Sequence, residues 1–162
     1  MKKNKNSYIS YLPKVRGTLL FGKDLSKISW LKVGGLAEIF FIPFDKKDLS
    51  FFLKNLPMNV PLTILGSCSN VIIRDGGIPG VVIKLGKNFN NISFDETSIL
   101  VGSSVMDARL SMEAAKFDFD LSFLRTIPGT IGGAVKMNSG CYGTYVSDVI
   151  ISTTLMSRNG DI

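Results

Sequence analysis

The segment Pro61-Leu-Thr-Ile-Leu-Gly-Ser-Cys-Ser-Asn70 places a short apolar strand directly before a loop of small polar residues. The strand is expected over residues 61–65, because this run is apolar and lies between a proline and a glycine. In the first loop, Gly66–Asn70, small side chains leave backbone N–H groups and side-chain donors accessible in one place. Such a loop fits a pyrophosphate, which needs oriented amides and no large side chain nearby. The alternative is an ordinary connecting turn, since the loop matches neither a Rossmann fingerprint nor a P-loop.

A second loop, Ile127-Pro-Gly-Thr-Ile-Gly-Gly-Ala134, is rich in glycine. Glycines permit the backbone to approach a ligand closely, and Pro128 restricts the entry to the loop. A short helix is expected over residues 134–138, with its N-terminal amides directed at the same ligand. The alternative is a tight connection whose glycines serve only their backbone dihedral angles. A third loop, Asn138-Ser-Gly-Cys-Tyr-Gly143, is by default a turn.

The rest of the sequence predicts an α+β fold with short strands, helices and frequent turns. Asp45 is a candidate N-cap for a helix that ends before Pro57. The apolar residues of that helix recur with helical spacing; they are Leu49, Phe52, Leu53 and Leu56. A second helix is expected over residues 104–116. Further strands are expected over residues 37–42, 81–83 and 98–101.

The end of the sequence predicts a strand and a turn. The β-branched segment from Val149 to Met156 is expected to form the strand. Asn159-Gly160 follows it, a strong hairpin signal, yet little sequence remains to return after that turn. We therefore expect the chain to be the front part of a longer protein. The alternative is a last strand that pairs with an earlier one and ends in a frayed turn.

Composition and charge exclude several classes of function. The sequence has no histidine and only two cysteines, Cys68 and Cys141, so neither a Ser-His or Cys-His nucleophile nor a zinc site is expected. The net charge of +6 arises in residues 1–23, which contain six basic residues and no acidic one. We expect this segment to be a solvated basic N-terminal arm, so no nucleic-acid partner is predicted. No stretch is long and apolar enough for a signal peptide or a membrane span, which predicts no membrane partner and a cytoplasmic location.

Five motifs follow one another along the chain. They are Trp30-Leu-Lys-Val-Gly-Gly-Leu-Ala-Glu38, Leu65-Gly-Ser-Cys-Ser-Asn70, Arg74-Asp-Gly-Gly-Ile-Pro-Gly80, and the second and third loops. In this order they resemble the UDP-N-acetylenolpyruvoylglucosamine reductase family of flavoenzymes. The resemblance implies an FAD-binding fold of the vanillyl-alcohol-oxidase (PCMH) type. It implies two α+β subdomains over residues 24–87 and 88–162, the second incomplete, and a substrate-binding C-terminal domain that is absent.

The same resemblance implies a cofactor site in the three loops. Its candidate FAD-binding residues are Gly66, Ser67, Cys68, Ser69, Asn70, Val71, Ile127, Pro128, Gly129, Thr130, Gly132, Gly133, Asn138, Gly140, Tyr142 and Gly143. The first two loops are expected at the FAD pyrophosphate and the third near the flavin. In the family, NADPH reduces FAD, and hydride then passes to the enolpyruvyl group of a UDP-sugar to form UDP-N-acetylmuramate, a peptidoglycan precursor.

The resemblance assigns no catalytic residue to this sequence. The family's catalytic arginine, serine and glutamate are expected beyond Ile162, the last residue of the sequence, and have no counterpart before it. No metal ligand is assigned either. We therefore expect an FAD-binding part of the reductase that is inactive alone and meets its UDP-sugar only if the missing domain is supplied. The alternatives are a non-catalytic flavin- or nucleotide-binding remnant and another flavin oxidoreductase of the same fold.

Two positions depart from glycines usual in the family. They are Cys68, in the first loop, and Thr126, directly before the second. A Cβ at either position hinders a left-handed backbone conformation. If the loop needs that conformation there, the residue would strain it by roughly 1–2 kcal/mol.

Overall fold

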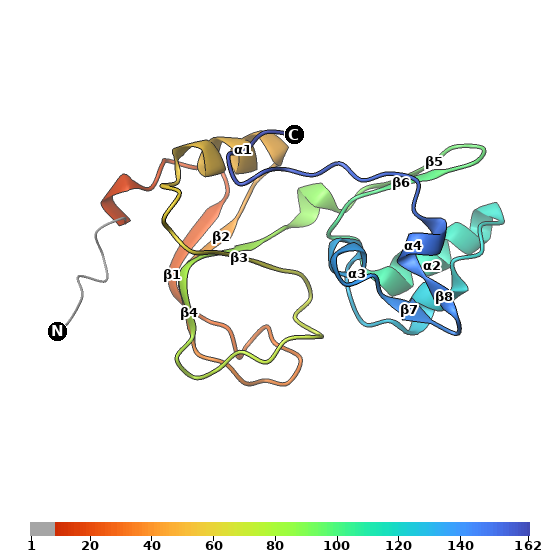
Figure 1. Ribbon diagram of the computed structural model, residues 1–162, viewed down its shortest axis with the longest axis horizontal. Coiled ribbons are helices and arrows are strands. Elements are labelled where there is room, and N and C mark those ends of the chain that lie inside the picture. The colour runs from red at the N-terminus through yellow and green to blue at the C-terminus, as the bar shows by residue number, and fades with distance from the viewer. Residues whose placement is uncertain (1–8) are drawn as a thin grey trace.

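The computed structural model describes residues 9–162, which form two halves side by side (Figure 1). The sheet half, residues 9–89, contains the turn η1 (Ile9–Tyr11), strands β1 (Thr18–Asp24), β2 (Leu36–Ile42), β3 (Leu62–Leu65) and β4 (Ile78–Lys84), helix α1 (Lys46–Asn55) and the turn η2 (Lys87–Phe89). The helical half, residues 92–150, contains β5 (Ile92–Phe94), β6 (Ile99–Val101), α2 (Asp107–Ala114), η3 (Ala115–Phe117), η4 (Ser122–Thr126), α3 (Ile131–Met137), β7 (Gly140–Cys141), β8 (Thr144–Tyr145) and α4 (Val146–Val149). This mixture of short elements confirms the predicted α+β class.

The four strands of the sheet half form one sheet in the order β1-β2-β4-β3. β1 runs antiparallel to β2, whereas β2 and β3 both run parallel to β4. Phe41 and Ile83 pack on one face with Phe52 of α1, and Phe40 and Val82 pack on the other. Neighbouring residues of a strand point to opposite faces, so the continuous apolar runs in β2 and β4 follow from burial on both sides.

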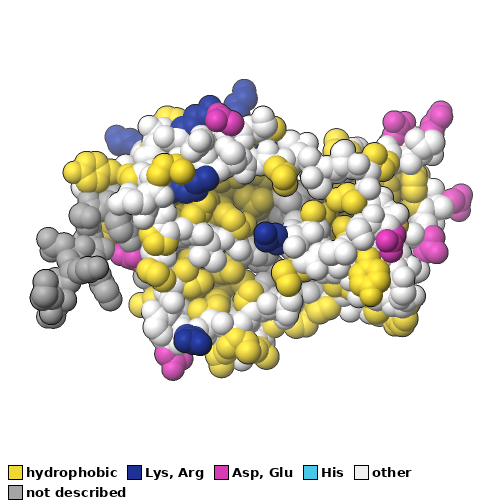
Figure 2. All heavy atoms as spheres, in the orientation of Figure 1, with side chains coloured by type: hydrophobic (Ala, Val, Ile, Leu, Met, Phe, Trp, Pro, Cys, Tyr) yellow, Lys and Arg dark blue, Asp and Glu magenta, His cyan; other side chains and the backbone are white. Residues whose placement is uncertain are grey.

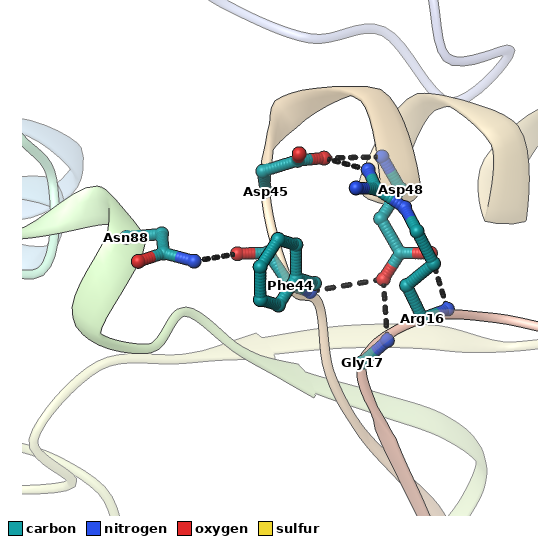
Figure 3. A network of polar contacts seen from close by, with 6 residues as sticks. All are labelled: Arg16, Gly17, Phe44, Asp45, Asp48 and Asn88. Atoms are coloured by element: carbon teal, nitrogen blue, oxygen red, sulfur yellow. Dashed lines mark hydrogen bonds and ion pairs between the residues drawn. The ribbon is translucent and has the colours of Figure 1, made fainter.

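Helix α1 begins where the sequence predicts. The Asp45 carboxylate accepts a hydrogen bond of 2.8 Å from the backbone N–H of Asp48. Asp48 is itself only 3% exposed, and its carboxylate accepts backbone hydrogen bonds from Arg16 (2.8 Å) and Gly17 (2.9 Å). A third backbone N–H, that of Phe44, donates to the same carboxylate at 2.9 Å (Figure 3). One buried carboxylate therefore joins the approach to β1, the loop after β2 and the first turn of α1.

The helical half has a core of its own. Its buried residues are Val105, Leu110, Phe123, Leu124, Ala134 and Val146. The two antiparallel pairs, β5 with β6 and β7 with β8, lie at its edges and contribute few buried side chains. The helix predicted over 104–116 corresponds to α2 and the turn η3 that follows it. No helix within residues 9–162 is both long enough and apolar enough to cross a membrane.

Strand β1 (Thr18–Asp24) overlaps the end of the segment expected to be a solvated basic arm, residues 1–23. Its residues pair with β2, from Thr18 opposite Ile42 to Asp24 opposite Leu36. The first part of the expected arm, residues 1–8, lies outside the described residues. The subdomain boundary placed between residues 87 and 88 stays a prediction.

The strand predicted from Val149 to Met156 is wrong. Val149 ends α4, and the residues after it are mostly exposed and form no strand; the Ile151 side chain is 81% exposed. Within residues 9–162, no neighbouring strand pairs with this segment, and a β-branched sequence cannot form a ladder alone. The predicted turn does form: Gly160 has a φ of +79° and its N–H donates to the Ser157 carbonyl at 3.0 Å.

The C-terminal segment returns to the sheet half instead of pairing within the helical half (Figure 1). Ser50 of α1 donates its hydroxyl to the Gly160 carbonyl at 2.6 Å. Arg158 Nη2 donates to the Pro57 carbonyl at 2.9 Å, and the Met156 side chain packs against the core beneath α1. The chain thus passes between the two halves twice, once after residue 89 and once in the C-terminal segment that returns to α1.

Candidate functional site

The first and second loops meet in space although they are far apart in sequence. The hydroxyl of Ser69 donates a hydrogen bond of 2.5 Å to the Pro128 carbonyl, across a separation of 59 residues. Close by, a Cβ on Gly66 would lie 2.7 Å from the Thr130 hydroxyl, so any larger residue there would require the Thr130 side chain to shift. The structure therefore brings together two of the three loops that the sequence singled out.

The first loop presents a series of unpaired backbone donors. None of the backbone N–H groups of residues 67–71 donates a hydrogen bond within the described part of the chain. The Ser67 and Ser69 hydroxyls lie 3.1 Å apart, and Cys68 between them has a φ of +59°. Consecutive amides around a left-handed residue form a concave anion-binding arrangement. These donors fit a phosphate or diphosphate.

The backbone conformation differs between Cys68 and Thr126, the two positions expected to replace glycines usual in the family. Cys68 is in the left-handed region, so its side chain is strained there by roughly 1–2 kcal/mol. Its thiol is buried and packs in the core below the loop, and this burial raises the pKa of the thiol. Thr126 closes the turn η4 and is not among the described residues with positive φ. Only the cysteine therefore carries the expected strain.

The second loop is held from below by Asp107, the first residue of α2. The backbone N–H of Asp107 donates to the Gly129 carbonyl at 3.2 Å. Its carboxylate is 1% exposed, and neither of its oxygens has a hydrogen-bond partner among the described residues. Burial without a partner raises the pKa of Asp107 to about 6. The second loop thus packs against the Asp107 carboxylate, which has no hydrogen-bond or ion-pair partner among the described residues.

Helix α3 begins three residues earlier than predicted, and its first two amides are bonded within the protein. It begins at Ile131 instead of residue 134, so it includes two of the loop's glycines. Its first amides are already used: Ile131 donates to the Val105 carbonyl at 2.9 Å and Gly132 donates to the Ser103 carbonyl at 2.8 Å. These two amides are therefore not available to a ligand, and the prediction that the helix N-terminus faces a ligand stays a prediction. Their bonds fix the loop to the start of α2 instead.

The third loop lies beside α3 and not against the first loop. Asn138 ends α3 with a φ of +45°, and its side-chain oxygen accepts a hydrogen bond of 2.9 Å from the Ser147 N–H. Gly140 lies under the Tyr145 ring, where a Cβ would come within 2.3 Å of that ring. Tyr142 is 82% exposed. Among the described residues, no hydrogen bond joins this loop to Gly66–Asn70, so its assignment to the cofactor remains a prediction.

The segment that ends at Ile162 lies at α1 and not at the loops. The Ile162 side chain is 76% exposed, and the preceding residue, Asp161, forms an ion pair of 3.2 Å with Lys54 of α1. The placement of the catalytic arginine, serine and glutamate beyond Ile162 concerns residues that this sequence does not contain, so it stays a prediction. No residue of the described chain is assigned a catalytic role.

Sequence reasoning missed two residues at the junction of the loops, Lys84 and Asp107. Lys84 ends β4 opposite Leu65 of β3, and its Nζ donates to the Gly66 carbonyl. A lysine that closes an apolar strand was a signal for it, because the carboxyl ends of neighbouring parallel strands lie together. For Asp107 the sequence offered no comparable signal, since an aspartate in a first helical turn is ordinary.

Comparison with known proteins identifies the family of the chain. A family model described as an FAD binding domain matches residues 37–162. The UDP-N-acetylenolpyruvoylglucosamine reductase of Roseobacter denitrificans is 48% identical over 154 residues, which cover 95% of this chain and 50% of that protein. The enzyme of the same name from Jannaschia sp. is 51% identical over 149 residues, which cover 92% of this chain and 48% of that protein.

A solved structure agrees with these matches. The crystal structure of UDP-N-acetylenolpyruvylglucosamine reductase from Thermus caldophilus superposes with a TM-score of 0.66 at 29% sequence identity. The match covers 83% of this chain and 47% of that one. The chain thus spans about half the length of the curated relatives it matches.

Proposed function

The chain belongs to the FAD binding domain family and is homologous to UDP-N-acetylenolpyruvoylglucosamine reductases, and on that premise we propose that it holds FAD for such a reductase. The proposed reaction reduces the enolpyruvyl group of UDP-N-acetylglucosamine enolpyruvate to UDP-N-acetylmuramate, with NADPH as the hydride donor. This reaction belongs to peptidoglycan precursor synthesis, and the proposed location of the protein is the cytoplasm. The polypeptide of residues 1–162 is proposed to bind the cofactor without completing the reaction by itself.

The observation that carries the proposal is the meeting of the first and second loops. Ser69 links the loops through the Pro128 carbonyl, next to the unpaired amides of residues 67–71. Those amides fit the FAD diphosphate, because each can donate to a phosphate oxygen without breaking a bond inside the protein. Glycine at position 66 keeps the space between the loops free of a side chain. FAD, when bound, would supply the hydride chemistry, and the residues of this chain would hold and orient it.

The third loop supports a second part of the same proposal. Asn138, Gly140, Tyr142 and Gly143 are proposed to lie near the flavin, since α3 connects them directly to the second loop. The exposed Tyr142 ring is free to contact a planar ligand. No residue of the chain is proposed as the proton donor to substrate. Asp107, whose pKa is raised, lies buried beneath Gly129 and does not face an open site.

FAD titration of the purified chain tests this function. We expect stoichiometric binding, seen as a shifted flavin absorption spectrum and a changed flavin fluorescence. Ser69→Ala should weaken binding by about 3- to 10-fold, the value of one hydrogen bond. Ser50→Ala is the matched control, because it also removes a hydroxyl bonded to a carbonyl but lies on α1, away from the loops. A folded chain that binds no FAD would contradict the proposal.

A second measurement separates an enzyme from a binding module. The FAD-loaded chain is mixed with NADPH and then with the UDP-sugar under anaerobic conditions, while flavin absorbance is followed. We expect no net NADPH-dependent reduction of the UDP-sugar by residues 1–162 alone. Full turnover by this polypeptide would overturn that part of the proposal. Bound flavin that NADPH never bleaches would favour the alternative, a non-catalytic flavin-binding module.

A further inference from the structure

Lys84 lies at the edge of the sheet where the first loop begins. It is the last residue of β4 and pairs with Leu65, which directly precedes Gly66. The parallel strands β3 and β4 therefore deliver a lysine and a loop of unpaired amides to the same place. In sheets with parallel strands, ligands bind outside the carboxyl ends of the strands.

The charge of Lys84 is not neutralised by the protein. The side chain is half-buried, and none of the ion pairs among residues 9–162 includes it. Its Nζ donates to the Gly66 carbonyl. An ammonium has three N–H donors, so two remain for another acceptor. A half-buried cation beside unpaired amides is an arrangement that favours an anion.

The surrounding charges support the same conclusion. The positive charge of Lys84 acts on the Cys68 thiol inside the first loop and partly opposes the effect of burial on the pKa of that thiol. On the face shown in Figure 2, most basic side chains lie over the sheet half and most acidic side chains lie over the helical half.

We propose that the Lys84 ammonium binds the diphosphate of the dinucleotide at the first loop and is a binding residue of the cofactor site. This inference rests on the proposed function, and it goes beyond that function by assigning the counter-charge for the diphosphate. Uncharged loop amides can orient phosphate oxygens, but they cannot balance two negative charges. Lys84 offsets one of these two charges from the neighbouring strand, while its bond to the Gly66 carbonyl holds the ammonium in place.

The test compares variants that separate charge from hydrogen bonding. Lys84→Gln removes the charge but keeps an N–H donor for the Gly66 carbonyl, and Lys84→Arg keeps the charge. Lys87→Gln, three residues on and exposed, is the matched control. FAD and inorganic pyrophosphate are titrated into each protein by calorimetry at several NaCl concentrations. Circular dichroism and unfolding temperature establish that each variant is folded.

We expect K84Q to bind FAD about 10- to 100-fold more weakly, the loss of one charge-assisted hydrogen bond. The salt dependence of its affinity should also be smaller, because screening acts on the lost charge. K84R and K87Q should retain near-normal affinity and salt dependence. A structural role alone would not change the salt dependence. Should K84Q fail to fold, Lys84→Met provides a second neutral side chain of similar length, with the same expectation.

These measurements distinguish a failure of the role proposed for Lys84 from a failure of the proposed function. Normal FAD binding by the parent chain, with K84Q equal to it in affinity and salt dependence, would overturn the role of Lys84 and leave the proposed function intact. Binding of pyrophosphate but not FAD, with the pyrophosphate affinity dependent on Lys84, would keep the anion site and overturn the proposed function. Binding of neither ligand by the folded parent chain would overturn both.

Discussion

The Oδ2 atom of Asp107 lies 2.4 Å from the place that a Cβ on Gly129 would occupy. The carboxylate thus fills the space below the second loop, and glycine at position 129 is required by a neighbour and not by its own dihedral angles. Both oxygens of that carboxylate are buried without a hydrogen-bond partner in the described chain. The relationship joins the geometry of the proposed cofactor loop to the protonation of one buried group.

Asp107 should make the stability of the chain depend on pH. Its pKa is raised from 3.8 to about 6 in the folded protein, so the folded state holds a proton that the unfolded state has lost between these pH values. The free energy of unfolding should therefore fall as the pH rises from about 4 to 6, by up to about 3 kcal/mol from this group. Above about pH 6 its contribution should level off.

Asp107→Asn isolates this contribution from those of other groups. The variant should lose this part of the pH dependence and should be more stable than the parent chain at pH 7.5, with little difference near pH 4. Urea unfolding at several pH values measures the difference. Parallel stability curves for the two proteins between pH 4 and 8 would contradict the prediction.

Gly129→Ala should disturb the second loop. The added Cβ would overlap the buried Asp107 carboxylate, so we expect a loss of about 1–3 kcal/mol in the free energy of unfolding. Gly133→Ala is the matched control, because its nearest atom, the Thr130 hydroxyl, would be 3.6 Å from the new Cβ, an ordinary contact. Alanine also favours the helix there. The idea fails if both variants unfold at the same urea concentration.

The left-handed backbone at Cys68 predicts an unusual order of stability. Cys68→Ala loses the packing of the thiol and keeps the backbone strain, whereas Cys68→Gly loses the packing and relieves the strain. We expect the glycine variant to be the more stable of the two by about 1 kcal/mol, although its side chain is smaller. Chemical denaturation of both variants measures this order. An alanine variant at least as stable as the glycine variant would show that the loop does not hold this conformation.

Asp48 should contribute more to stability than its neighbour Asp45. Asp48→Asn puts an amide among three backbone donors, so we expect the free energy of unfolding to fall by about 2–4 kcal/mol. Asp45→Asn should change it by less than about 1 kcal/mol, because asparagine is also a good N-cap. Thermal and urea unfolding of both variants provide the comparison. Equal losses would mean that Asp48 acts only through the helix terminus.

Local signals in the sequence were sufficient for most elements. The N-cap at Asp45, the apolar spacing after it and the strand that precedes Gly66 all formed where the pattern predicted them. These features depend on neighbours within a few residues, whose propensities and side-chain spacing can be read directly. Strand β1 was missed because its sequence, within the basic segment, forms a strand only through pairing with β2.

The segment from Val149 to Met156 shows the opposite error. Its β-branched residues have a high strand propensity, but propensity forms no ladder without a partner, and the segment instead leads back towards α1. Strand formation is decided by long-range pairing more than by composition. The same limit applies to Arg158, whose bond to the Pro57 carbonyl spans 101 residues.

The sequence by itself determined the α+β class, the N-cap of α1 at Asp45 and the loops with small residues, because each follows from short-range sterics and hydrogen bonding. Only the tertiary structure decided that Ser69 meets Pro128, that Lys84 lies beside Gly66 and that Asp107 is buried below Gly129. These contacts depend on how the strands are ordered and how the two halves pack. The pKa and the hydrogen-bond partners of a buried charged group depend on neighbours that are distant in the chain, and no local sequence pattern specifies those neighbours.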